Sequence, residues 1–149
     1  MHLEELLTLD SCRSKVEGVS KKRVINTVSD LIAQQLDDVE SDEVFAALMG
    51  REQLGTTGLG KGIAIPHCRL AQCTKAIGAL VSLDSPVDYD SLDGEPVDLV
   101  FALIVPEDGD DEHVKALGEI ASLFLDEDLC FTLRHTFDDE DLYNVAIMT

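Results

Sequence analysis

Residues 51–67 read REQLGTTGLGKGIAIPH and carry the strongest local signals in the chain. Glycines at positions 55, 58, 60 and 62 interrupt a helical pattern, which predicts a loop whose backbone adopts unusual angles or approaches another group closely. The apolar run 63–65 predicts a short strand, and Pro66 stops it. We therefore expect His67 to end this strand at a sheet edge, shortly after a glycine-rich loop.

The segments before this loop predict two helices. Ser20 is a suitable N-cap, and apolar side chains follow it at i, i+3 and i+4 spacing, so we predict an amphipathic helix over residues 21–37. A second helix is expected from Ser41, because Asp42 and Glu43 in its first turn suit the positive end of a helix dipole.

The segments after His67 predict strands followed by helices. The apolar runs 76–83 and 97–105 are bounded by prolines and indicate buried strands. Helices are expected over about 111–125, near 127–134 and near 138–147, the last capped by Asp138. This order predicts the fold class α/β, with residues 1–149 forming a single domain in which helices cover a mixed β-sheet.

The net charge of −19 is distributed unevenly along the chain. Residues 1–83 hold 11 acidic and 9 basic side chains, whereas residues 84–149 hold 19 acidic ones against only Lys115 and Arg134. Because nucleic acid binding requires lysine and arginine, this composition disfavours nucleic acid as a partner. An anionic ligand is expected to bind the first half, and the acidity of the second half also promotes solubility.

Nothing in the sequence predicts export or membrane insertion. Residues 1–10 carry three acidic side chains among leucines, unlike a signal peptide, and no segment reaches about 18 uninterrupted apolar residues. We therefore expect a cytoplasmic protein whose four cysteines are reduced. The spacing of these cysteines matches no common zinc site; they are Cys12, Cys68, Cys73 and Cys130.

An imidazole in the position of His67 suits a phosphoryl acceptor. It is neutral and nucleophilic near pH 7, since its ordinary pKa is about 6.5, and attack on phosphorus gives a phosphoramidate reactive enough to be passed on. The phosphoryl oxygens need donors, which backbone N–H groups of the glycine loop and a guanidinium can supply. Arg51, Lys61 and Arg69 are close in sequence, and His113 opens a later helix where it could meet His67.

These residues alone leave other interpretations open. A histidine at the end of a strand is frequently structural, and His113 could simply lie on the surface of a helix N-terminus. Cys68 beside His67 suggests a Cys–His nucleophile or a metal site, but neighbouring strand residues point to opposite faces, which disfavours both. His2 and His135 lie in a terminal segment and a polar turn and indicate no function.

The segment Arg51–His67 closely resembles the active-site signature of the enzyme IIA domains of the mannitol/fructose class of the bacterial phosphotransferase system. Within that class, residues 20–23 (Ser-Lys-Lys-Arg) are similar to the nitrogen-regulatory members. The stretch Pro96–Pro106, followed by His113, also follows the family pattern. The resemblance covers essentially the whole chain and departs at two packing positions, Val114 and Gly118, where leucine and alanine are expected.

The resemblance implies that His67 is the phosphoryl acceptor, that Arg51 stabilises the phosphoryl group and that His113 assists. It also implies a histidine-phosphorylated carrier protein as donor, regulatory target proteins as partners, and transfer without a bound metal, nucleotide or other cofactor. The sequence thus predicts a regulatory phosphocarrier of the nitrogen-related phosphotransferase system, a transferase component more than a stand-alone enzyme. Two alternatives remain: a sugar-specific IIA that passes phosphate to a fructose or mannitol IIB component, and a protein-binding module that is not phosphorylated.

Overall fold

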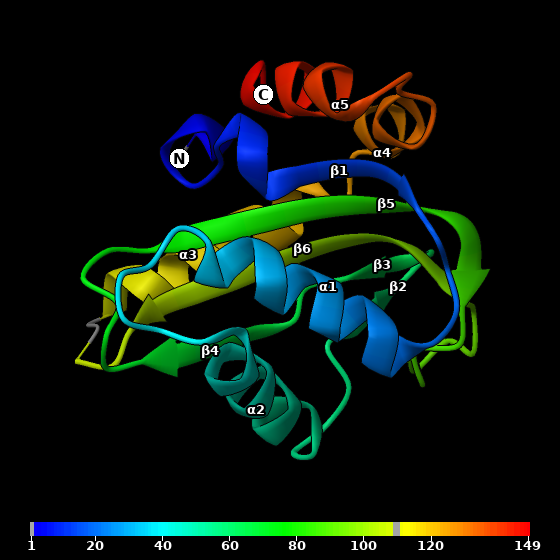
Figure 1. Cartoon of the computed structure of the whole chain (residues 1–149). Coiled ribbons are helices and arrows are strands. Elements are labelled where there is room, and N and C mark those ends of the chain that lie inside the picture. The colour runs from blue at the N-terminus through cyan, green and yellow to red at the C-terminus, as the bar shows by residue number, and fades with distance from the viewer. Residues whose placement is uncertain (1, 109–110) are drawn as a thin grey trace.

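The computed structural model describes residues 2–108 and 111–149, and of residues 111–113 the backbone only. Within these residues six strands form one mixed sheet with helices on both faces (Figure 1). The strands are β1 (Cys12–Val16), β2 (Gly58–Gly60), β3 (Ile63–Ala64), β4 (His67–Leu70), β5 (Ile77–Val87) and β6 (Val97–Pro106). The helices are α1 (Lys21–Ala33), α2 (Ser41–Glu52), α3 (Asp111–Leu123), α4 (Glu127–Arg134) and α5 (Asp139–Ile147), preceded by the 3-10 turns Leu3–Glu5 and Leu9–Ser11.

The sheet is organised around the antiparallel pair β5 and β6. β1 runs parallel to β5, and β2 is antiparallel to β3. β3 and β4 both pair with β6 in parallel, one after the other along its length, with Ile63 opposite Leu99 and His67 opposite Leu103. Among the described strands β6 is the only neighbour of β4, so His67 lies on an edge strand.

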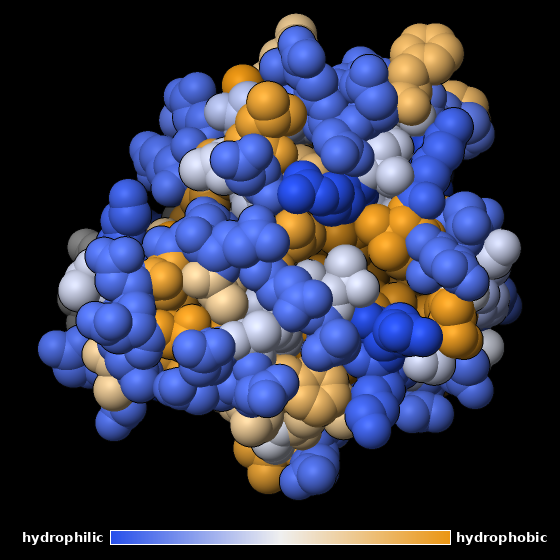
Figure 2. Space-filling view, in the orientation of Figure 1, coloured by the Kyte–Doolittle hydropathy of each residue, from blue (hydrophilic) through white to orange (hydrophobic). Residues whose placement is uncertain are grey.

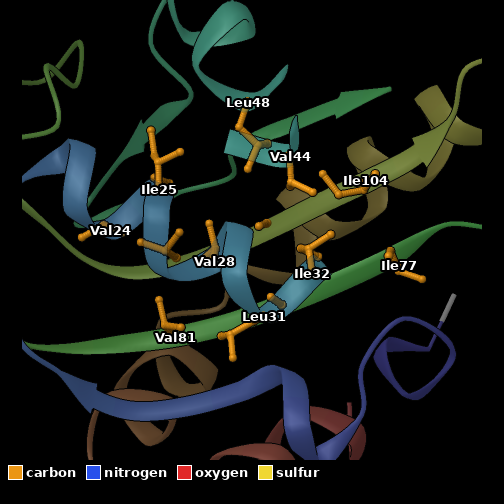
Figure 3. Close-up of a cluster of buried hydrophobic side chains, with 14 of the residues drawn as sticks. Val24, Ile25, Val28, Leu31, Ile32, Val44, Leu48, Ile77, Val81 and Ile104 are labelled. Atoms are coloured by element: carbon orange, nitrogen blue, oxygen red, sulfur yellow. The ribbon is translucent and has the colours of Figure 1, made fainter. Parts of the chain in front are cut away.

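Alternate residues of the two long central strands face two separate hydrophobic cores, as the period of two in a strand requires. On one face, α1 and α2 pack on inward residues of β5 and β6 (Figures 1 and 3). This α1–α2 core includes Val24, Ile25, Val28, Ile32, Val44, Leu48, Val81, Val100 and Ile104. On the other face, the α3–α5 core includes Leu80, Leu99, Phe101, Leu103, Ile120, Phe124, Leu133 and Leu142.

The predicted α/β class and the mixed sheet covered by helices are confirmed by this architecture. The predicted N-caps also hold, because Ser20 Oγ accepts from Arg23 N at 3.1 Å and Asp138 Oδ1 accepts from Asp141 N at 2.8 Å. The helix expected over 21–37 ends at Ala33, four residues early. Gln35 and Leu36 form tighter i to i−3 bonds instead, so the chain leaves the helix through turns.

Three strands were not predicted from the sequence: β1, β2 and β4. Each lies beyond the central β5–β6 pair, is short, and carries glycine or charged residues. Their strand conformation depends on pairing with β5, β3 and β6 respectively, which no local pattern reveals.

The two ends of the chain lie together on the same side of the molecule (Figure 1), and His2 Nδ1 is 3.4 Å from the carbonyl oxygen of Thr149.

The face formed by α1 and α2 is mostly hydrophilic, with apolar patches between the polar side chains (Figure 2). In the described part of the chain, every helix is too short or too polar to cross a membrane.

Candidate functional site

A cavity of about 590 Å³ opens at the edge of the sheet, bounded by α2, β4, β6 and α3. His67 and Arg51, two of the site residues predicted from the sequence, both line this cavity. Most of the remaining wall is apolar; the other lining residues are Ala47, Gly50, Leu54, Cys68, Arg69, Leu103, Val105, Val114 and Leu117. The contribution of Leu103 and Val105 was not predicted from the sequence, because the apolar run 97–105 was interpreted only as a core strand.

The backbone around Pro66 fixes the position of His67. The prediction that His67 ends the strand begun at Ile63 is wrong, because β3 ends at Ala64 and His67 is the first residue of a separate strand, β4. Pro66 separates these strands, and its carbonyl accepts a hydrogen bond from Leu103 N at 2.9 Å. β4 is thereby aligned on β6, and the half-buried imidazole stands at the open edge of the sheet.

The imidazole of His67 is held by its own strand connection. Its Nδ1 is 2.8 Å from the carbonyl oxygen of Ile65. A carbonyl oxygen only accepts, so Nδ1 carries the proton and donates to Ile65. In the neutral ring Nε2 then keeps its lone pair, which makes Nε2 the nucleophilic atom.

The surroundings of His67 favour the neutral ring. Burial lowers the pKa of His67 below its ordinary value of 6.5, because desolvation disfavours the imidazolium. The hydrogen bond to Ile65 opposes this shift, the charge of Arg51 adds to it and the charge of Glu52 opposes it. At pH 7 the ring is therefore a neutral imidazole.

Arg51 lies in the last turn of α2 and brings a guanidinium to the cavity. Its Nη1 donates to the carbonyl oxygen of Gly55 at 2.9 Å, which closes the start of the glycine-rich loop. A guanidinium has five N–H donors in a planar fork, so this single bond leaves others to meet an anion. The arrangement brings together a neutral nucleophile and a fixed cation in one cavity.

Several N–H groups of the glycine-rich loop, which was expected to supply anion donors, are already bonded within the protein. The N–H groups of Thr57, Gly58 and Lys61 are bonded to Glu52, Thr56 and Asp93 within the protein. Lys61 does not line the cavity, and its Nζ is 3.5 Å from Glu127 Oε1 at the start of α4. The loop instead forms β2 and the turn into β3, so its glycines shape the connection that leads to His67.

Cys68 and Arg69 follow His67 on β4 and also line the cavity. Burial raises the pKa of the Cys68 thiol to about 12, so the thiol stays protonated and is a poor nucleophile. Its side chain packs against the α1–α2 core, whereas His67 is paired with Leu103 of the α3–α5 core. The two side chains therefore point to opposite faces of the sheet, as the sequence predicted. Arg69 Nη1 reaches the carbonyl oxygen of Glu107 at 3.4 Å.

The side chain of His113 lies outside the described residues. The same helix carries Val114 and Leu117, which line the cavity opposite the α2 wall. That the imidazoles of His113 and His67 lie close together therefore remains a prediction.

Comparison with known proteins identifies the family of this chain. Residues 5–147 match the model of the family described as "Phosphoenolpyruvate-dependent sugar phosphotransferase system, EIIA 2". The chain belongs to this family. Within the family it is similar to a nitrogen regulatory protein from Pseudomonas aeruginosa, with 44% identity over 147 residues that cover 99% of this chain and 96% of the relative.

Solved structures of EIIA proteins share the fold. The nitrogen regulatory protein IIA-Ntr of Neisseria meningitidis superposes with a TM-score of 0.87 at 34% identity, covering 97% of this chain and 98% of that one. IIA mannitol of Escherichia coli superposes with a TM-score of 0.76 at 19% identity, covering 94% and 98%. The second similarity establishes the fold alone, and the first agrees with the nitrogen-regulatory resemblance read from residues 20–23.

Proposed function

We propose that this protein is a regulatory phosphocarrier that accepts a phosphoryl group on Nε2 of His67 from a histidine-phosphorylated carrier protein. The phosphorylated and free forms then bind regulatory partner proteins differently, in the cytoplasm. The observation that carries the proposal is the hydrogen bond from His67 Nδ1 to Ile65, which leaves the Nε2 lone pair available in a cavity shared with Arg51.

The transfer needs no proton from the protein. The Nε2 lone pair attacks phosphorus while the P–N bond to the donor imidazole breaks; the donor ring, protonated on its other nitrogen, takes back the electron pair and leaves as neutral imidazole. The His67 ring becomes positively charged as the new bond forms. The Ile65 carbonyl, 2.8 Å from Nδ1, is placed to stabilise this charge through a stronger hydrogen bond.

Arg51 and the apolar wall have complementary roles in this proposal. The guanidinium offers N–H donors to the phosphoryl oxygens, whose negative charge moves into the cavity. The buried side chains of Leu103 and Val105 limit access of water, which strengthens that attraction and slows hydrolysis of the phosphoramidate.

We assign His113 an assisting role on the basis of the family motif. It follows an acidic segment (Glu107, Asp108, Asp110, Asp111 and Glu112), and nearby carboxylates favour a protonated or donor imidazole. A donor ring suits a hydrogen bond to a phosphoryl oxygen and is a poor nucleophile. The proposal therefore has His67 accept the phosphoryl group and His113 stabilise it.

The direct test is incubation with purified phosphorylated carrier proteins of the nitrogen-related and the sugar branches, followed by intact-mass measurement. One phosphoryl group should be taken up, preferentially from the nitrogen-related carrier, and should be acid-labile and alkali-stable as a phosphoramidate is. Proton-coupled phosphorus NMR should show the group on Nε2.

The matched variants are His67→Ala and His135→Ala. His135 is exposed, stacks on Phe131 and does not line the cavity, so its variant should be phosphorylated at the normal rate. Uptake by His67→Ala at the wild-type rate would disprove the assignment. Onward transfer to a fructose or mannitol IIB component would instead favour the sugar-specific alternative.

A further inference from the structure

Glu52 is a buried carboxylate next in sequence to Arg51, which lines the cavity. Glu52 is the last residue of α2 and the neighbour of Arg51, and only 2% of its side chain is exposed. An ionised carboxylate is rarely buried to this degree unless charged or hydrogen-bonding partners surround it. Glu52 does not line the cavity, so its burial is not explained by direct contact with a phosphoryl group.

Glu52 has a full set of donors from three separate segments. Lys21 Nζ at the start of α1 is 2.9 Å away. Thr57 donates through its backbone N at 3.2 Å and through its hydroxyl. The Tyr89 hydroxyl, from the connection after β5, donates at 3.2 Å. Lys21 also stands 4.6 Å from the centre of the Tyr89 ring, a cation–π contact.

This network fixes the segment that carries Arg51. Consecutive residues of a helix point about 100° apart, so the orientation of Glu52 determines that of Arg51. Beyond the helix, residues 53–57 form a short loop that is closed twice, by Glu52 to Thr57 and by Arg51 Nη1 to the Gly55 carbonyl. The guanidinium, the loop and the end of α2 therefore form one hydrogen-bonded unit.

We propose that Glu52, held by Lys21, Thr57 and Tyr89, is a positioning residue that directs the Arg51 guanidinium toward the phosphoryl group on His67. This inference rests on the proposed function. Lys21 is thereby assigned to the buried network and not to binding the phosphoryl group or a partner.

The charges near His67 agree with this geometry. The negative charge of Glu52 raises and the positive charge of Arg51 lowers the pKa of the His67 imidazole. The two opposite charges on adjacent residues partly cancel at the nucleophile. Removal of the Glu52 charge would leave the effect of Arg51 unopposed, so the His67 ring would titrate at lower pH.

The test compares Glu52→Gln with Tyr89→Phe, which removes one hydroxyl donor while keeping the ring beneath Lys21. Glu52→Gln should slow phosphoryl uptake on the order of 10²-fold, the loss that follows a displacement of about 1 Å in a reacting site. Tyr89→Phe should give a smaller loss in the same direction. NMR titration of the unmodified proteins should show a lower pKa for His67 in Glu52→Gln.

Leu142→Ala is the matched stability control, because Leu142 is fully buried in the α3–α5 core, on the other face of the sheet from Glu52. It should lower the melting temperature and leave the rate of uptake unchanged at a temperature where all variants are folded. If Glu52→Gln does not fold, the uptake rate of Tyr89→Phe alone tests the proposal: a slower rate supports the positioning role, and a wild-type rate contradicts it.

Wild-type rates and an unchanged His67 pKa in the folded variants would overturn the positioning role while leaving phosphorylation at His67 intact. A wild-type protein that takes up no phosphoryl group would overturn the proposed function itself, and the positioning role with it.

Discussion

Gly62, in the loop that precedes His67, is a position where a side chain is poorly tolerated. Its φ angle is +82°, in the left-handed region that residues with a Cβ avoid. Its carbonyl oxygen accepts from both Asp98 N and Leu99 N, which sets the register of β3 on β6. A Cβ at this position would lie 2.7 Å from Arg134 Nη2 and 3.0 Å from Asp98 Oδ1.

Gly62→Ala should therefore destabilise the protein by about 2 kcal/mol. The left-handed conformation costs an alanine about 1–2 kcal/mol. Arg134 must also move, and its bonds to the Lys61 carbonyl and to Asp98, both 2.8 Å, are partly exposed, so their disturbance costs about 1 kcal/mol. The smaller conformational entropy of the unfolded alanine chain returns about 0.5 kcal/mol.

Gly118→Ala is the matched control, since it makes the same chemical change in the exposed interior of α3 with no atom within 4 Å of the added Cβ. It should stabilise the protein by about 0.5–1 kcal/mol, because glycine is a poor helix former. Urea unfolding followed by circular dichroism measures both. Equal stability of the two variants would refute the argument from the left-handed backbone and the Arg134 contact.

Three further predictions concern the site. Arg51→Lys keeps the charge but loses the planar fork, so phosphoryl uptake should slow on the order of 10²-fold in single-turnover assays, and an unchanged rate would remove Arg51 from the site. NMR titration of His67 should give a pKa below the ordinary value of 6.5, and a pKa at or above 6.5 would contradict this prediction. As the pH drops through 6.5, the imidazole of the unfolded chain binds a proton before that of the folded protein does. The contribution of His67 to the free energy of unfolding should therefore fall over this pH range. Phosphorylation adds a charge of about −1.5 to −2, so acidic partner proteins should bind the phosphorylated form more weakly in calorimetry, whereas equal affinity of all partners for both forms would exclude a switch.

The helices and the two long strands were predictable because each has a strong local period. α1 has an apolar stripe and the Ser20 cap, and β5 and β6 are apolar enough to read as strands buried on both faces. β4 was not predictable in this way, since Pro66 indicates a break and its four residues include a histidine and an arginine. Only pairing with β6 makes this segment a strand.

The candidate site was predictable to the extent that its residues are close in sequence. Arg51 and His67 belong to one motif and line one cavity. That Thr57 N and Lys61 N of the loop bond to Glu52 and Asp93 was not predictable, because neither partner can be identified from spacing. The network behind Arg51 was not predicted either, because Lys21 and Tyr89 lie 31 and 37 residues from Glu52 and no local pattern links them.

The position of His67 at the start of an edge strand would satisfy two opposed requirements that the proposed transfer between proteins imposes. The acceptor must be sufficiently desolvated to remain neutral, and burial achieves this by lowering the pKa of His67. It must also be reached by an imidazole on another protein, which a residue in the centre of the sheet could not be. β4 meets both requirements, because among the described strands it pairs only with β6, while Leu54 and Val114, 83% and 63% exposed, form an apolar rim on either side of the cavity. A partner that contacts this rim also lies close to His67 and interacts with the charge that this residue carries. In the proposed function, transfer and regulation therefore depend on the same surface, and a variant of the rim such as Leu54→Asp should weaken donor and regulatory binding together.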